Sequence, residues 1–583
     1  MISVNASAQS YILSIQSADS FTNAYLTELK VRNKFEDIES LRLYSKTFIQ
    51  DVRSQGYLSA SIDSFTPFED TVTVNFFLGR KYEWASLRWT ETTENWLTEI
   101  GKSSTLFQNV PINPKELTKT TDKLLTYGEN HGYPFAKVYI DSLMNIGETG
   151  FSGILAVEAN RLFRYDTITV EGDAKISTAF LGQYLNIIPG ELYQEKAVRN
   201  IKQKLQKLPF VQITDNPKVF FVDDEVRIIV SIKHRNTDQI DGIVGFAPNA
   251  NSEAGLLVTG EVNIDLKNLF KRGIGYDVHW KSFAARSQQL QMNAQLPYLL
   301  KSPIGIDGNF DYVKFDTNFF TLNTRLGVRY LFEGTDYIKF YVQNHQSALI
   351  FADTNNIRVS RQIPNSNPTR TTSYGMKVQR QTLDNPFNPR KGISFSLDGN
   401  LGSRNVLKDI RIEQVLFRNM NNETYSVYDS TNLKSIQAEV LYNVELFLPV
   451  GKKSTVVGLI SGQHLITETV FLNDLYRFGG TKSLRGFNEE SLLSNSYTIV
   501  GLEYRYLLGG NAFFQLFANA AYLEDKSNMQ QGLITDTPFG FGAGVHLDVN
   551  SGILSLAYAL GSEQGNGIQF NQAKIHFGII NYL

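Results

Sequence analysis

The sequence predicts a chain in two parts: three small α+β modules, each in the order strand, helix, helix, strand, strand, and then a sixteen-stranded antiparallel transmembrane β-barrel. Three observations predict this. Helical and extended patterns alternate up to residue 235; from Ile240 onward segments of about 10–16 residues alternate in hydropathy. No run of about 18 uncharged apolar residues could span a bilayer as a helix. A membrane protein of this composition must therefore cross with strands.

The best-defined module covers residues 161–236. Phe163–Gly172 alternates apolar and polar residues and predicts a strand. Ser177–Leu185 and Glu195–Leu208 have helical spacing, so each should bury one stripe against a sheet. Val211–Asp215 and Val219–Lys233 predict two further strands, which complete the order.

The same order recurs at a spacing of about 75 residues. Modules are expected at 10–81 and 82–160, and in the second of these strands are predicted at 82–90, 134–144 and 153–160 and helices at 95–101 and 113–132. The peptides SQGYLSAS, HGYPFAKV and QKLPFVQI mark the passage from helix to aromatic strand in the three modules. Residues 1–9 are an N-terminal tail or a signal remnant, since Ala6-Ser7-Ala8 resembles the end of a signal peptide.

The barrel is expected over residues 237–583. Its sixteen strands are predicted near 240–247, 254–266, 273–285, 287–297, 303–314, 317–333, 336–350, 371–383, 390–402, 433–448, 453–466, 496–508, 511–524, 537–549, 552–562 and 569–583. The long connections 351–370, 403–432, 467–495 and 525–536 all fall on odd turns. This asymmetry between the two ends is typical of outer-membrane barrels.

Composition argues against several functions. Lys and Arg (56) nearly equal Asp and Glu (58), so no basic field predicts nucleic-acid binding. Cysteine is absent, which excludes thiolate metal sites, disulfides and cysteine nucleophiles. The sequence lacks G-x-S-x-G and H-E-x-x-H motifs, and its seven histidines are scattered. We therefore expect no enzyme, no cofactor and no metal site.

The connection 467–495 contains the peptide Leu484-Arg485-Gly486-Phe487. An arginine between a large apolar residue and a Gly-aromatic pair, preceded by Gly479-Gly480, suits a loop tip that folds back and docks. The loop precedes a strand that carries Glu503.

These residues resemble the BamA and TamA family of outer-membrane insertases and translocases, whose (V/L)RG(F/Y) loop enters the barrel lumen. The peptides NLFKRG (268–273) and DNPFNPRKG (384–392) and the glycine run at 539–544 resemble the same family. The resemblance covers most of the chain and implies that the three modules are POTRA domains. Three modules are closer to TamA than to BamA, which typically has five.

The resemblance assigns Arg485 two partners. Glu503 matches the luminal glutamate of the family, and Asn519 stands where the family usually has an aspartate. A bidentate pair between Arg485 and Glu503 would lock the loop inside the barrel. Two alternatives stay open: Glu503 is an ordinary polar lumen residue, or Arg505 is its partner instead.

A weak lateral seam is expected where the first strand meets the last. Ile240, Gly242 and Gly245 lie in a short, glycine-containing first strand, and Phe577 and Ile579 lie in the last. Few ladder bonds would be lost if such a seam opened, and an opened edge could template a client strand.

The family resemblance implies a protein of the bacterial outer membrane, with POTRA modules in the periplasm, that assembles or translocates outer-membrane proteins. Its expected partners are unfolded outer-membrane clients, outer-membrane lipid including lipopolysaccharide, and periplasmic or inner-membrane accessory proteins. A two-partner-secretion polypeptide transporter is the main alternative, although it typically has two POTRA modules. A passive porin would leave the front modules unexplained.

Overall fold

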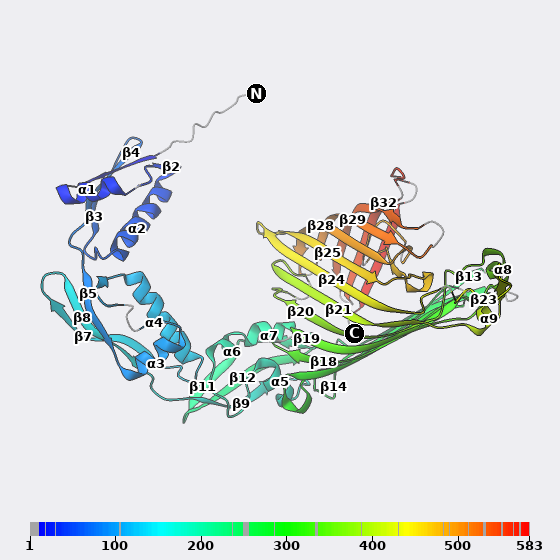
Figure 1. Ribbon diagram of the computed structural model, residues 1–583. Coiled ribbons are helices and arrows are strands. Elements are labelled where there is room, and N and C mark those ends of the chain that lie inside the picture. The colour runs from blue at the N-terminus through cyan, green and yellow to red at the C-terminus, as the bar shows by residue number, and fades with distance from the viewer. Residues whose placement is uncertain are drawn as a thin grey trace. The chain divides into compact units, whose positions relative to one another are not determined.

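The structure is a computed structural model. It describes residues 11–248 and 256–581, apart from 18, 30, 104–106, 236, 285, 333–335, 386–387, 430, 482, 489, 511, 529–531, 550–551, 564, 569 and 571–572. The N-terminal tail predicted at 1–9 lies outside these residues. The chain separates into two compact units, 1–166 with 189–198 and 220–227, and 167–188 with 199–219 and 228–583 (Figure 1). Among the helices described, none is long and apolar enough to cross a membrane.

The first module builds a four-stranded sheet in the order β2-β1-β4-β3. Its elements are β1 (Tyr11–Gln16), α1 (Ser20–Glu28), β2 (Lys34–Phe35), α2 (Ile38–Ser54), β3 (Ser61–Phe68) and β4 (Thr71–Phe77). Asp19 and Asp37 cap the two helices by accepting hydrogen bonds from first-turn N–H groups. The helices bury apolar stripes against the sheet, with Leu41 and Val52 of α2 in its core.

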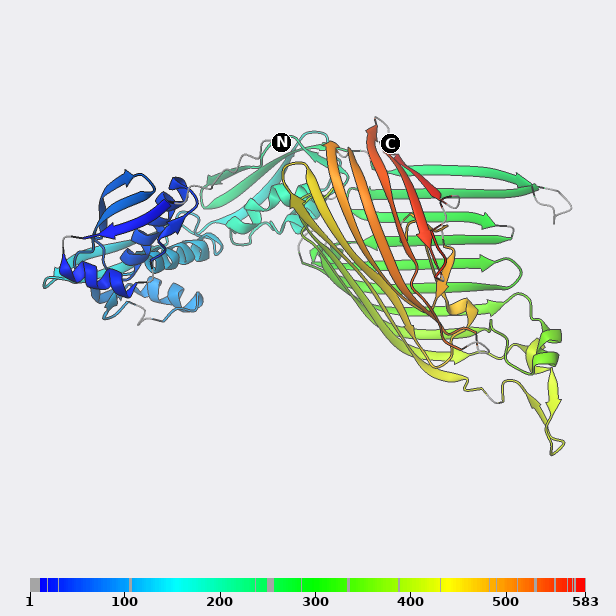
Figure 2. The ribbon, with the colours of Figure 1, turned by 90° about the horizontal axis from the view of Figure 1, so that it is seen from above.

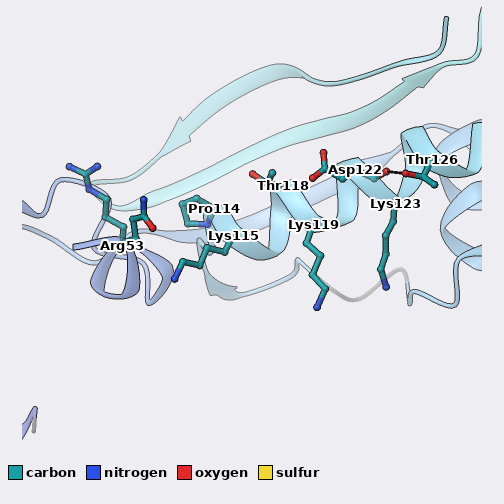
Figure 3. Close-up of a pocket in the computed structure, with 9 residues that line it drawn as sticks. Arg53, Pro114, Lys115, Thr118, Lys119, Asp122, Lys123 and Thr126 are labelled. Atoms are coloured by element: carbon teal, nitrogen blue, oxygen red, sulfur yellow. Dashed lines mark hydrogen bonds between the residues drawn. The ribbon is translucent and has the colours of Figure 1, made fainter. Parts of the chain in front are cut away.

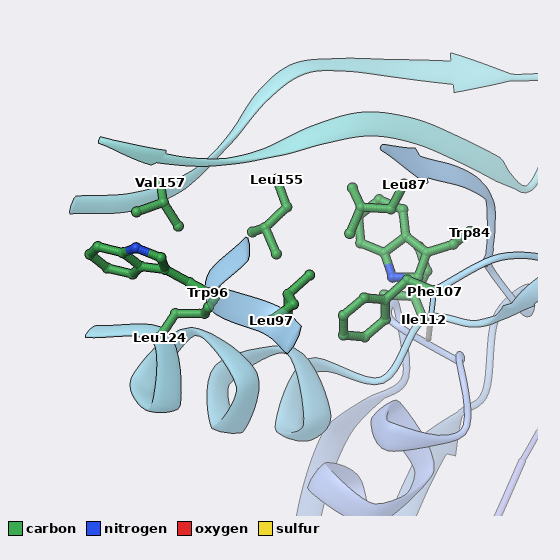
Figure 4. Close-up of a cluster of buried hydrophobic side chains, with 9 residues drawn as sticks. All are labelled: Trp84, Leu87, Trp96, Leu97, Phe107, Ile112, Leu124, Leu155 and Val157. Atoms are coloured by element: carbon green, nitrogen blue, oxygen red, sulfur yellow. The ribbon is translucent and has the colours of Figure 1, made fainter. Parts of the chain in front are cut away.

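The second module repeats this arrangement with the sheet order β6-β5-β8-β7. Its elements are β5 (Glu83–Trp89), α3 (Glu91–Glu99), β6 (Val110–Pro111), α4 (Pro114–Glu129), β7 (Lys137–Ile146) and β8 (Gly150–Glu158). Figure 4 shows its core, in which Trp96, Leu97 and Leu124 of the two helices face Leu155 and Val157 of the sheet. Helix α3 begins at Glu91, before the start predicted at residue 95, and the side chain of the preceding Thr90 caps it.

The third module contains β9 (Arg164–Glu171), α5 (Thr178–Leu185), α6 (Glu195–Arg199), α7 (Ile201–Lys207), β10 (Val211–Ile213), β11 (Lys218–Val222) and β12 (Glu225–His234). The single strand predicted at 219–233 is wrong. It is a hairpin, because Asp223 and Asp224 turn the chain with φ of 49° and 68°. The helix predicted at 195–208 is likewise two short helices on either side of Asn200.

Among the described residues from 239 onward, most strands belong to one antiparallel sheet whose path contains 17 strands. Sixteen of them have eight or more residues: β13 (Gln239–Pro248), β14 (Leu256–Leu269), β15 (Ile274–Ala284), β16 (Ser287–Leu296), β17 (Ile304–Phe315), β18 (Phe319–Leu331), β19 (Tyr337–Leu349), β20 (Thr369–Gln381), β21 (Gly392–Val406), β24 (Lys434–Val450), β25 (Ser454–Ile466), β28 (Ser496–Gly509), β29 (Ala512–Asp525), β31 (Phe539–Val549), β32 (Gly552–Ser562) and β33 (Lys574–Asn581). The other is the three-residue β30 (Ile534–Asp536). The predicted sixteen-stranded antiparallel architecture is confirmed.

The sheet curves from its first strands to its last (Figures 1 and 2) but does not close. Within the described residues, β13 pairs with β14 alone and β33 pairs with β32 alone. The expected pairing of the first strand with the last is therefore absent from the described ladders, and each of these strands has an open edge.

The two faces of the sheet differ in chemistry. On β28, Tyr497, Ile499 and Glu503 are buried, whereas Leu502 and Tyr504 are exposed. The two-residue period of a strand explains this alternation. The exposed face carries apolar side chains suited to lipid, so the buried face is the lumen side.

The long connections carry structure that the sequence pattern did not predict. The connection after β19 contains α8 (Thr354–Ser360), and the one after β21 contains α9 (Ile410–Glu413) and the hairpin β22 (Leu416–Arg418) with β23 (Thr424–Ser426). Together they bury a small apolar cluster, here called the cap core: Ile357, Ile363, Val406, Ile412, Val415, Val427, Tyr428 and Phe471.

Candidate functional site

The connection 467–495 folds back onto the lumen face of the sheet. Its arms are the 3-10 helix η2 (Leu472–Asp474) and the paired strands β26 (Tyr476–Phe478) and β27 (Leu492–Ser494). Phe478 stacks on Tyr497 of β28 with 4.1 Å between ring centroids. Leu484 and Phe487 at the tip are buried in a cluster with Ile499 of β28. The tip therefore packs against the lumen face of the sheet.

Glycines allow the tip to turn and to approach the wall. The N–H of Gly480 donates to the carbonyl of Leu484 over 3.0 Å, which closes the turn. Gly486 has φ of 99°, and a Cβ there would lie 2.6 Å from the carbonyl oxygen of Leu560. Any side chain at position 486 would therefore push the tip away from β32.

Arg485 meets both of its predicted partners. Its Nη2 donates to Glu503 Oε2 over 3.0 Å and to Asn519 Oδ1 over 3.5 Å. Its guanidinium also lies 3.8 Å from the centroid of the Phe517 ring. The predicted bidentate geometry is wrong, because one guanidinium nitrogen makes both bonds.

The reason is a second arginine. Arg505 Nε donates to Glu503 Oε1 over 2.5 Å, so each carboxylate oxygen serves a different guanidinium. The alternative that Arg505, instead of Arg485, is the partner of Glu503 therefore does not hold, because Glu503 accepts a hydrogen bond from each arginine. Two cations and one anion leave this cluster with a formal charge of +1. Asn519 adds no charge, but its Nδ2 donates to the Ser483 carbonyl over 3.3 Å and so holds the tip by its backbone.

The tip also contacts the last three strands. A Cβ at Gly540 of β31 would overlap the carbonyl of Arg485, and one at Gly561 of β32 would lie 2.7 Å from the carbonyl oxygen of Gly486. On β33, His576 Nε2 accepts from the N–H of Gly486 over 3.4 Å, and its Nδ1 lies 3.2 Å from Thr481 Oγ1. Sequence reasoning assigned the glycine run to tight packing but missed His576.

A second anchor holds the base of the loop and was also missed. Asp474 pairs with Arg404 of β21 over 2.5 Å, and Arg404 is only 2% exposed. Arg404 Nη1 also donates to Gln437 Oε1 of β24 over 2.9 Å. Phe471, three residues before Asp474, belongs to the cap core, so the base of the loop packs against the connections that form this core.

The predicted seam residues lie on the two open edges and are not brought together. Gly242 faces Val262 and Gly245 faces Thr259, both in β14. Phe577 faces Leu556 and Ile579 faces Leu554, both in β32. Ile240 is 62% exposed. The side chains of Phe577 and Ile579 lie outside the described part of the structure.

In the front modules, a groove between α2 and α4 has a volume of about 680 Å³. Lys115, Lys119 and Lys123 project from one side of α4 at four-residue spacing (Figure 3). Lys115 pairs with Asp51 over 2.5 Å. Within the described residues, no three His, Asp or Glu side chains are placed to hold a metal ion.

Comparison with known proteins gives the following matches. Residues 268–580 match the model of the Omp85 superfamily domain. The fold is similar to that of CdiB from Escherichia coli, with 13% identity, 93% of this chain and 97% of that chain covered, and a TM-score of 0.52. It is also similar to CdiB from Acinetobacter baumannii, with 14% identity, 90% and 94% covered, and a TM-score of 0.50. BamA from Haemophilus ducreyi lacking POTRA domains 1–3 matches with 16% identity, 85% and 98% covered, and a TM-score of 0.42.

Proposed function

We propose, starting from the fact that this chain belongs to the Omp85 superfamily, that it inserts strand-rich clients into the outer membrane through the gap between β13 and β33. Members of this superfamily, BamA and CdiB among them, mediate outer-membrane protein insertion or secretion, and membership of this superfamily supports an outer-membrane location for this chain.

The observation that carries the proposal is the pair of open edges. Each edge offers unpaired backbone N–H and C=O groups in a strand that already sits in a sheet. A client strand that pairs with an edge satisfies its own backbone groups before it meets hydrocarbon. Folding of the client supplies the driving force, so the reaction needs no catalytic residue, nucleotide or metal.

The inserted loop has a separate role in this proposal. It lies on the lumen face beside the last strands, where the hydrogen bond from Arg485 to Glu503 holds it. A filled lumen favours exit of the client sideways into lipid over passage straight through the sheet. The three α+β modules lie in the periplasm in this proposal and receive the client, together with accessory proteins, before it reaches the seam.

A disulfide staple across the seam tests the proposal, because the chain has no native cysteine. Cysteines are placed at Gly242 or Gly245 and at Phe577 or Ile579, and the pair that oxidises in the membrane is used. We expect the stapled protein to lose insertion of newly made β-barrels, and reduction to restore it. The matched control is a cysteine pair at Val545 and Leu556, which already face each other in β31 and β32. Full insertion by the stapled seam would refute the proposal.

Secretion of a polypeptide through the lumen is the second candidate, favoured by the likeness of the fold to the two CdiB structures. The same staple separates the two functions. A lumen route continues when the seam is closed, whereas insertion through the seam stops. The lumen route should respond instead to deletion of residues 476–493.

A further inference from the structure

A second cavity lies at the end of the barrel where the third module packs. It has a volume of about 400 Å³ and lies between α5 and the turns that follow β14 and β16. We propose that this cavity, here called the rim cavity, binds one phospholipid with an anionic headgroup. The acyl chains would lie against its apolar wall and the phosphate against two cations.

The walls of the rim cavity are held in place by contacts between the third module and the sheet. The N–H of Ser177 donates to the carbonyl of Lys271 over 2.8 Å, and Asn268 Nδ2 donates to the carbonyl of Lys175 over 2.6 Å. Phe180 packs edge-on to Tyr298 with 5.6 Å between centroids. These contacts hold the residues before α5 and the turn after β14 together, and they form two sides of the cavity.

The apolar wall continues the lipid-facing surface of the barrel. Leu296 lines the cavity and shares a face of β16 with Leu290 and Met292. The other face of β16 carries Gln289, Gln291 and Asn293, which belong to the lumen side. An acyl chain of the surrounding bilayer can thus enter the cavity without leaving an apolar surface.

The charged residues that line the rim cavity are Arg272 and Lys301, and none of the described residues that line it is acidic. Neither cation forms an ion pair within the described part of the chain. A guanidinium and an ammonium beside an apolar wall match the phosphate and acyl chains of one lipid, whereas a soluble phosphate would use only the cations.

The turn between β16 and β17 is strained in a way that lipid would explain. Tyr298, Leu300 and Lys301 have φ of 53°, 52° and 59°, in the left-handed region that non-glycine residues seldom occupy. Leu300 is 90% exposed. A leucine held outward on a strained turn loses favourable contacts in water but gains them against acyl chains.

Photolabelling tests the inference. The full chain is placed in phosphatidylcholine nanodiscs that contain a small fraction of phosphatidylglycerol with a photoreactive acyl chain. After irradiation, we expect adducts on peptides covering 177–183 and 296–301, and at least a five-fold loss of them in R272A/K301A. The matched control is K452A/K453A, two exposed lysines on the turn between β24 and β25 at the same end of the barrel. Labelling of the outer strand face at 326–330 should be equal in all samples.

Two further arms make the inference falsifiable. Leu300→Asn suits the left-handed backbone and should keep or raise the unfolding temperature while it lowers labelling of 296–301. Photoreactive phosphatidylcholine should label these peptides several-fold less than phosphatidylglycerol. Equal labelling by both lipids, unchanged labelling in R272A/K301A, or full competition by free glycerol 3-phosphate would each overturn the inference. The orientation of this end toward the periplasm rests on the proposed function, but labelling does not depend on client insertion, so the two can fail separately.

Discussion

Glu503 accepts hydrogen bonds from two arginines. Its substitution should therefore lower the free energy of unfolding more than substitution of Arg485 does. Glu503→Gln leaves two buried guanidiniums without a counter-charge and should cost about 3–5 kcal/mol of unfolding free energy. Arg485→Ala leaves the pair of Glu503 with Arg505 intact and should cost only about 1–3 kcal/mol. Urea unfolding in detergent measures both, and equal losses would contradict the shared-acceptor arrangement.

Asn519→Asp should tighten the loop. The cluster of Arg485, Arg505 and Glu503 has a formal charge of +1, and an aspartate would neutralise it. The new carboxylate would also meet Arg485 Nη2, which already lies 3.5 Å from Asn519 Oδ1. We expect a nitroxide at the exposed Asn488 to become less mobile in the variant. Asn519→Ala, which removes the bond to Ser483 without adding charge, should make it more mobile; the same change in both variants would refute the charge argument.

At the residue scale, the sequence predicted the partners of Arg485 because they lie in a recognisable family peptide. It did not predict the pair of Arg404 with Asp474, since these residues are 70 positions apart and neither belongs to such a peptide. It also missed His576, because a lone histidine on a strand gives no sign of what packs against it.

The cap core joins the inserted loop to the connections after β19 and β21, and Phe471 is the residue the loop contributes. Phe471→Ala should cost about 3–5 kcal/mol, because its side chain is fully buried. We expect faster protease cleavage within 407–433 in intact membranes. The control is Leu416→Ala, in β22 of the same connection, because this side chain is 60% exposed. It should leave the rate of protease cleavage unchanged.

Helix α9 should loosen at low pH. The hydrogen bonds from Arg411 to Asp409 hold the pKa of this carboxyl below its ordinary value of 3.8. A lowered folded-state pKa stabilises the cap fully above pH 3.8, and this contribution is lost as the pH falls through the lower folded-state value. A fluorophore at the exposed Met420 should rotate more freely in that window. Asp409→Asn should show the loosened state at every pH.

At the element scale, the strands of the sheet were easier to predict than the structure in the long connections between them. The sixteen long strands follow from a two-residue period that burial on one face imposes. The hairpin of β22 with β23 was missed because its cap core draws residues from three separate connections. The turn at Asp223 and Asp224 was missed because apolar residues lie close on both sides of it, at 219–222 and from Val226 onward, so the two strands resemble one apolar segment.

At the scale of the whole molecule, the third module and the sheet should fold without the first two modules. The hydrogen bonds that join them, from Asn268 to Lys175 and from Lys207 to Gln381, lie within one compact unit. A chain lacking residues 11–160 should therefore keep the heat-modifiable gel migration of the barrel but lose client insertion. Loss of the folded band would show that the front modules are needed for folding itself.

The contact of His576 with the loop tip makes the last strand and the loop mechanically continuous. A client strand that pairs with β33, as we propose, would pull on this strand, and the contact of His576 with the N–H of Gly486 would carry the movement to the loop tip. The neighbouring Arg485 would then move relative to Glu503. In that case the loop would leave the lumen after the client strand has docked, and not before.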